Sequence, residues 1–128
     1  MTDVFRTISS CIIALFCCLL PVFSITGEHP ILIISSYNPD AGRTSGNISD
    51  FMEEFQRLGG TNTIALENMN CKSFSESPLW ERRMVELLSK YQGDNSPALT
   101  VLIGQEAWAA YLSLPDSIRG NTPVVSAL

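Results

Sequence analysis

The feature that most constrains the fold is a repeated alternation of short apolar runs with longer stretches of helical spacing. Four runs rich in β-branched and other apolar residues recur along the chain, separated by polar segments. They are Ile31–Ile34, Thr63–Leu66, Ala98–Ile103 and Pro123–Ser126. A short continuous apolar run of this kind is typical of a strand that is buried on both faces, as in a parallel sheet. The sequence therefore predicts four strands.

The stretch after the first run predicts a helix over Asn47–Leu58. Its apolar residues recur three or four positions apart, which places them on one face of a helix. Asn47 with Asp50 makes a plausible amino-terminal cap, and Gly59-Gly60 makes a plausible stop.

Two further helices are expected later in the chain. Ser77-Pro78 opens the first, with Ser77 at the cap and Pro78 at the first helical position, and Gly93 ends it. Gly104-Gln105 leads into a shorter helix that ends before Pro115.

The resulting order, β-α-β-α-β-α-β, predicts a three-layer α/β fold. Right-handed crossovers would place helices on both faces of a parallel sheet in the order 2-1-3-4. The last strand is expected to be fully buried, yet no helix follows to cover it. Residues 25–128 are therefore expected to be the amino-terminal part of a larger, incomplete domain.

The amino terminus predicts export. Ile8–Phe23 is an uncharged run of about 16 residues, short of the roughly 20 that span a bilayer as a helix. Arg6 precedes the run, and Val22 and Ser24 suit the small-residue positions of a signal-peptidase site. We interpret residues 1–24 as a cleaved signal peptide and the rest as periplasmic or otherwise extracytoplasmic. The alternative is an uncleaved membrane anchor.

Cysteine content and charge exclude several classes of site and partner. Cys11, Cys17 and Cys18 lie in the signal segment, so only Cys71 remains and no internal disulfide can form. One Cys and one His, His29, cannot make a four-ligand zinc cage. The net charge of −5, without a cluster of Lys or Arg, disfavours nucleic acid and anionic lipid as partners.

Polar residues at the ends of the four strands form the candidate site. Parallel strands bring their carboxyl ends to one edge, where ligands of open α/β sheets bind. The candidate ligand-binding residues are Ser35, Ser36, Tyr37, Glu67, Asn68, Gly104, Gln105 and Ser126. Ser36, Tyr37, Glu67 and Gln105 are expected to face one crevice that suits a small polar ligand. The alternative is structural: Tyr37 packs under the loop at residues 39–44, and Glu67 caps a turn.

Common enzyme motifs do not occur. The chain has no G-x-G-x-x-G after its first strand, no phosphate-binding P-loop and no G-x-S-x-G elbow. Its single histidine, His29, precedes the first strand and is badly placed for a catalytic triad. No catalytic residues and no cofactor are therefore expected. A small-molecule enzyme of the flavodoxin-like group remains an alternative to the ligand-binding functions considered below.

Three segments resemble a known family. Ile31–Pro39 resembles the "hydrophobic strand, then S-Y-x-P" opening of the periplasmic-binding-protein-like sensor domains of bacterial sensor histidine kinases. Leu66–Lys72 is similar to that family's "V-E-x-M-D-T-K" segment, with Asn70 and Cys71 in place of Asp and Thr. Thr122–Val125 matches its "x-P-V-V" strand. A related group of substrate-binding proteins of ABC transporters has the same opening.

The resemblance implies a flavodoxin-like lobe of a type 1 periplasmic-binding domain. A second lobe would close over the ligand, and the parent protein would be a two-component histidine kinase, with dimerisation possible. The leading functional hypothesis is extracytoplasmic small-molecule sensing, and the alternative is a transporter's substrate-binding protein. The Asn70 and Cys71 departures bear on which ligand is bound more than on the fold.

Overall fold

A computed structural model describes residues 29–127, and the expected signal peptide at residues 1–24 lies outside them. The elements run β1 (Ile31–Ser35), α2 (Gly42–Arg57), β2 (Ile64–Asn68), η2 (Phe74–Glu76), α3 (Ser77–Ser89), η3 (Gly93–Asn95), β3 (Leu99–Ile103), α4 (Gln105–Ser113), α5 (Asp116–Arg119) and β4 (Val124–Ala127). Both η elements are short 3₁₀ turns. The helices of the described residues are all too short or too polar to cross a bilayer.

The four strands form one parallel sheet in the order β2-β1-β3-β4. This confirms the predicted order. β1 lies in the centre, with Ile33 beside Leu66 of β2 on one side and Val101 of β3 on the other. All five residues of β1 are buried, as expected of a strand covered on both faces.

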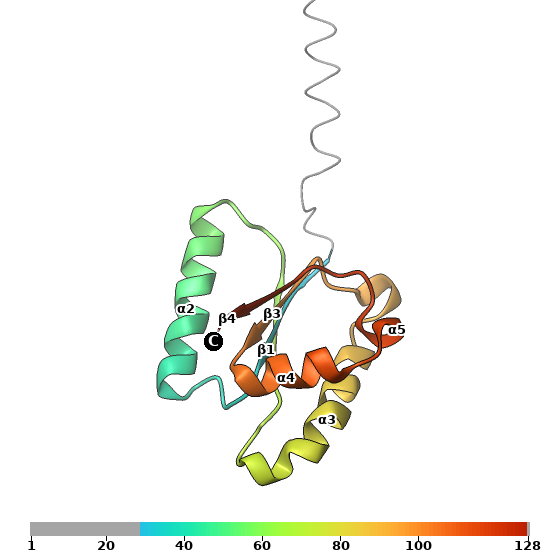
Figure 1. Cartoon of the computed structure of the whole chain (residues 1–128). Coiled ribbons are helices and arrows are strands. Elements are labelled where there is room, and N and C mark those ends of the chain that lie inside the picture. The colour runs from blue at the N-terminus through green and yellow to red at the C-terminus, as the bar shows by residue number, and fades with distance from the viewer. Residues whose placement is uncertain (1–28, 128) are drawn as a thin grey trace, which may run out of the picture.

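Helices cover both faces of the sheet, which makes the fold three-layered (Figure 1). On one face, α2 buries Ile48 against Ile31, Ile33 and Val101 of the central strands. On the other face lie α3 and α4. Successive strand residues point to opposite faces, so the unbroken apolar run of β1 supplies both cores at once.

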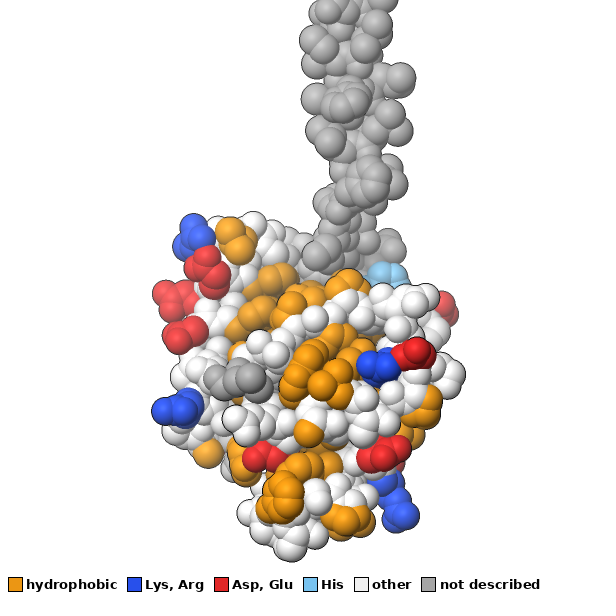
Figure 2. Space-filling model, in the orientation of Figure 1, with side chains coloured by type: hydrophobic (Ala, Val, Ile, Leu, Met, Phe, Trp, Pro, Cys, Tyr) orange, Lys and Arg blue, Asp and Glu red, His pale blue; other side chains and the backbone are white. Residues whose placement is uncertain are grey.

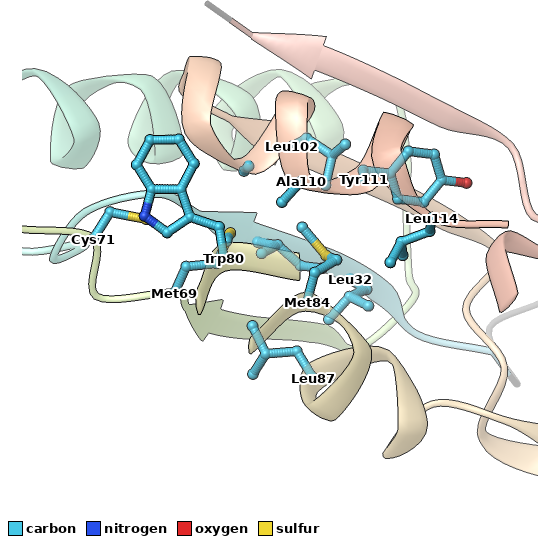
Figure 3. Packing of buried hydrophobic residues seen from close by; sticks show 12 residues of the cluster. Leu32, Met69, Cys71, Trp80, Met84, Leu87, Leu102, Ala110, Tyr111 and Leu114 are labelled. Carbon is cyan, nitrogen blue, oxygen red and sulfur yellow. The ribbon is translucent and has the colours of Figure 1, made fainter. Parts of the chain in front are cut away.

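The larger core lies under α3 and α4 (Figure 3). Met84 of α3 is completely buried and packs in the same cluster as Leu32 and Leu102 of the sheet. Trp80 and Tyr111 stand at opposite ends of the sticks in Figure 3. The tyrosine hydroxyl points away from the cluster, toward the amino-terminal ends of the strands.

The helix limits differ from the predicted ones. α2 begins at Gly42 rather than at Asn47, and no side chain caps it, so the proposed Asn47 cap is wrong. α3 begins at Ser77, but Glu76 occupies the cap position, again without a side-chain hydrogen bond. It ends at Ser89, well before Gly93.

The fourth strand is only partly buried within residues 29–127. β4 is an edge strand, and Val125 leaves 47% of its surface exposed. Figure 2 shows hydrophobic side chains at the molecular surface near this edge of the sheet. α2 covers the central strands, so the apolar residues of both edge strands on that face, Leu66 and Val125, stay partly open.

Candidate functional site

The sheet changes winding direction between β1 and β3. β1 is followed by α2 on one face, and its neighbour β3 is followed by α4 on the other. The connections therefore diverge, leaving a crevice beyond the carboxyl ends of these two strands. Ligands of open α/β sheets bind at such a point.

Ser36 links the two strand ends beneath this crevice. The buried Ser36 Oγ donates a hydrogen bond to the Ile103 carbonyl (2.9 Å) and accepts one from the Ala107 amide (2.9 Å). It thereby ties the end of β1 to the end of β3 and to the first turn of α4. Ser36 has no exposed surface, so its role in this structure is to position the surrounding backbone.

Tyr37 spans the crevice from the β1 side. The buried Ser35 Oγ donates to the Tyr37 carbonyl (2.5 Å), which fixes the backbone where the chain leaves the strand. The Tyr37 hydroxyl donates to Glu106 in the first turn of α4, and 43% of the residue is exposed. This hydrogen bond, with a smaller effect of burial, raises the pKa of the Tyr37 phenol. The ring is thus held at the rim of the crevice by its hydroxyl group.

A hollow of about 260 Å³ lies beside this tyrosine. Its walls come from the first turns of α2 and α4 and from the ends of β3 and β4. The lining residues are Tyr37, Arg43, Thr44, Asn47, Ile103, Gly104, Gln105, Glu106 and Ala127. Three of the sequence-predicted residues, Tyr37, Gly104 and Gln105, therefore meet in one hollow.

The hollow presents a cation, a carboxylate and neutral hydrogen-bonding groups. Arg43 is exposed and makes no hydrogen bond or ion pair with another described residue. The amide of Gln105 is likewise unengaged within residues 29–127, whereas Glu106 accepts from Tyr37. Two helices begin at the hollow, and free backbone N–H groups at helix amino termini favour negative charge. Arg43 and these N–H groups could together hold an anionic or polar ligand group.

The other predicted residues lie outside the hollow. Glu67 belongs to β2 and accepts from the Tyr91 hydroxyl (2.7 Å), with Lys90 Nζ at 3.5 Å, so it is engaged by the two residues that follow α3. Asn68 Oδ1 accepts from the Asn70 amide (2.7 Å) and closes a turn. The expectation that Glu67 faces the crevice with Tyr37 is therefore not met.

Ser126 also stands apart from the hollow. It lies on the exposed edge strand β4, level with Leu102 of β3 and on the same face as that residue. Its neighbour Ala127 is the β4 residue that lines the hollow.

Sequence reasoning missed the three residues that α2 contributes, Arg43, Thr44 and Asn47. The predicted helix began at Asn47, which left the first two in a loop of no assigned role. A usable signal was present, because a helix that follows a parallel strand starts at the carboxyl edge of the sheet. Polar residues just after the first strand were therefore candidates for the site, whether or not they fell within the apolar spacing of the predicted helix.

Cys71 is buried below the β2 loop and is unsuited to nucleophilic chemistry. Burial, reinforced by Glu106, raises the pKa of its thiol from 9.0 to about 11. The thiol is therefore protonated at neutral pH, and the thiolate is the reactive form. The geometry favours the interpretation of Cys71 as a small core residue.

No protein-family model matches the chain, and no curated protein or solved structure matches it either. The geometry of the hollow is therefore the basis on which its chemistry is judged.

Proposed function

We propose that this chain binds a small polar ligand in the hollow between α2 and α4, as the extracytoplasmic ligand-binding part of a sensor histidine kinase. One observation carries the proposal: unengaged Arg43 and Gln105 side chains and the rim residue Tyr37 line one hollow at the switch point of a parallel sheet. Polar groups left without protein partners beside a hollow are suited to hydrogen-bond a ligand.

The family resemblance supports the sensor assignment. The Ser35–Pro39 segment, which carries the "S-Y-x-P" likeness, supplies Tyr37 to the lining of the hollow. The parallel sheet with helices on both faces is compatible with a flavodoxin-like lobe. We propose accordingly that this unit is one lobe of a type 1 periplasmic-binding domain, and that a second lobe closes over the hollow.

The alternative is the substrate-binding protein of an ABC transporter, which uses the same opening motif. Ligand binding alone does not distinguish the two assignments, because both require it. The genomic surroundings do: kinase domains encoded with this segment support the sensor, whereas adjacent permease and ATPase genes support the transporter.

Ligand binding to the purified chain tests the proposal directly. A panel of amino acids, small carboxylates and sugars is titrated and followed by amide chemical shifts in NMR spectra. A true ligand shifts the signals of Tyr37, Thr44 and Gln105. Tyr37→Ala and Gln105→Ala are each expected to weaken its affinity by on the order of 1–3 kcal/mol, the cost of one lost buried polar contact.

Gln56→Ala is the matched control, because Gln56 is an exposed amide farther along α2 and does not line the hollow. It is expected to bind like the parent chain. If Tyr37→Ala and Gln105→Ala both retain the parent affinity and the parent fold, the hollow is not the binding site. Loss of folding in either variant is detected by its thermal transition, and the remaining variant then decides.

A further inference from the structure

A second hollow lies at the opposite edge of the sheet, where the strands begin. It has a volume of about 210 Å³ and is enclosed by the end of α3, by α4, by α5 and by the start of β3. Thr100 of β3, Tyr111 of α4 and Arg119 of α5 line it. None of these residues lines the hollow at the carboxyl edge, so the two spaces are separate.

Two largely buried residues that line this hollow carry hydroxyl groups without partners in residues 29–127. Thr100 is 2% exposed and Tyr111 is 8% exposed. Neither side-chain hydroxyl makes a hydrogen bond with any residue in the described part of the chain. Figure 3 shows the Tyr111 hydroxyl projecting beyond the end of the apolar cluster. Both hydroxyl oxygens keep some accessible surface in the hollow, so they are available to hydrogen-bond a ligand there.

A third donor comes from Arg119. Its Nε is buried and has no hydrogen-bond partner within residues 29–127. Its Nη2 pairs with Asp116, but 94% of that carboxylate side chain is exposed, so solvent screens the pair. The buried side of the guanidinium therefore keeps a free N–H. A hydrogen bond from a charged donor to an acceptor is stronger than one from a neutral donor.

The remaining walls are mixed in character. Leu88, Pro97 and Ile118 supply apolar surface beside the three donors. Burial raises the pKa of the Tyr111 phenol, an effect that the nearby Arg119 partly opposes. The phenol is therefore protonated at neutral pH and serves as a donor. Together the walls are complementary to a small molecule with one anionic acceptor group and a short apolar tail.

We propose that this hollow is a second ligand site, which takes a short-chain carboxylate. The carboxylate oxygens accept from Arg119 Nε, the Tyr111 hydroxyl and the Thr100 hydroxyl, and the hydrocarbon tail lies against the apolar wall. The volume limits the ligand to a few carbon atoms, because drug-sized ligands need roughly 300 Å³ or more. This site is independent of the one proposed at the carboxyl edge, and neither proposal requires the other.

Titration of the purified chain with sodium butanoate, followed by amide chemical shifts, tests this second site. We expect saturable shifts at Thr100, Tyr111 and Arg119 and none at Tyr37 or Gln105. Arg119→Met keeps the apolar stem and removes the charged donor, and it is expected to weaken binding at least tenfold. Tyr111→Phe removes one hydroxyl and is expected to weaken binding about fivefold.

Arg57→Met is the matched control, because Arg57 also pairs with a carboxylate three residues earlier on its own helix and does not line this hollow. It is expected to leave the butanoate affinity unchanged. Sodium chloride at equal concentration is expected to produce no saturable shift at these positions. Equal shifts with chloride, equal affinity in Arg119→Met, or no saturation with butanoate would each overturn the proposal. If Arg119→Met fails to fold, Tyr111→Phe decides by the same criterion.

Discussion

Gly104 and Ser36 show how one close contact shapes the crevice. Gly104 has a φ of 98°, in the region that favours glycine over every other residue. A Cβ placed on Gly104 would lie 2.4 Å from Ser36 Oγ and 2.8 Å from Ser36 Cβ. The same Ser36 Oγ bonds to the end of β3 and to α4. Only a residue without a side chain lets the two segments approach this closely.

Gly104→Ala is therefore expected to lower the free energy of unfolding by on the order of 3 kcal/mol, from backbone strain and the steric clash combined. Gly46→Ala is the control: Gly46 lies inside α2 with open space around its Cβ position, and Ala favours a helix by about 1 kcal/mol. Urea unfolding midpoints measure both changes. A Gly104→Ala variant as stable as the parent chain would show that the close contact does not exist.

Ser36→Ala tests the same contact from the other side. The loss of its two buried hydrogen bonds is expected to cost about 1–3 kcal/mol. Combined with Gly104→Ala, it removes the oxygen that causes the shortest clash, so the double variant should cost less than the sum of the two single changes. Strict additivity in the urea midpoints would contradict this coupling.

Among the elements, α2 shows where sequence periodicity fails. Its apolar stripe, from Ile48 onward, meets the sheet and was predicted from spacing. Its first turn extends beyond the sheet edge, so no core selects apolar residues there. That turn carries Arg43 and Thr44, which line the candidate site. Periodicity reports burial, and it cannot detect a helical turn whose residues face a solvent-filled hollow.

The strand assignments succeeded because burial did dictate their residues. Strands β1 and β3 are nearly continuous apolar runs, and their order in the sheet was predicted correctly. The predicted order also placed β4 at an edge of this sheet, where Val125 is exposed. Glu67 was misplaced, because β2 continues through it and its side chain accepts a hydrogen bond from Tyr91.

At the element scale, the packing of α3 can be tested with a pair of methionines. Met84 of α3 is completely buried, whereas Met52 of α2 is 37% exposed. Met84→Ala leaves a cavity between α3 and the sheet and is expected to cost about 2–5 kcal/mol. Met52→Ala should cost less than about 1 kcal/mol, because its side chain is only partly removed from water. Equal losses in thermal or urea unfolding would mean that α3 does not present Met84 to the sheet.

Across the whole molecule, hydrogen-bonding groups concentrate at the two ends of the sheet, while its middle is sealed by two apolar cores. A parallel sheet produces this division, because its strands start together at one edge and end together at the other. On the α3 and α4 side, the Tyr91 hydroxyl donates to Glu67, and the Tyr111 hydroxyl points toward the amino-terminal ends of the strands. Because folding creates both environments, the ionisation of these two phenols is linked to the free energy of unfolding.

High pH is expected to destabilise the protein as a unit. Burial, together with the hydrogen bond to Glu67, raises the pKa of Tyr91 from 10.0 to about 12. Burial raises that of Cys71 from 9.0 to about 11. The pKa values of Tyr37 and Tyr111 are also raised. In each case the folded state holds the proton more tightly than the unfolded state does, so deprotonation favours unfolding.

The stabilisation from these four groups is complete below about pH 8, where both states are protonated. It declines as the unfolded state begins to lose protons and is gone once the pH passes the folded-state pKa values of about 11 for Cys71 and about 12 for Tyr91. The urea midpoint should therefore hardly change between pH 7 and 8 and should fall steadily between pH 8 and 12. Tyr91→Phe removes one of these groups, so its midpoint should fall less steeply above pH 10 than that of the parent chain. A parent midpoint that is the same at pH 8 and pH 11.5, or equal slopes in the two proteins, would contradict the burial and hydrogen bonding assigned to Tyr91.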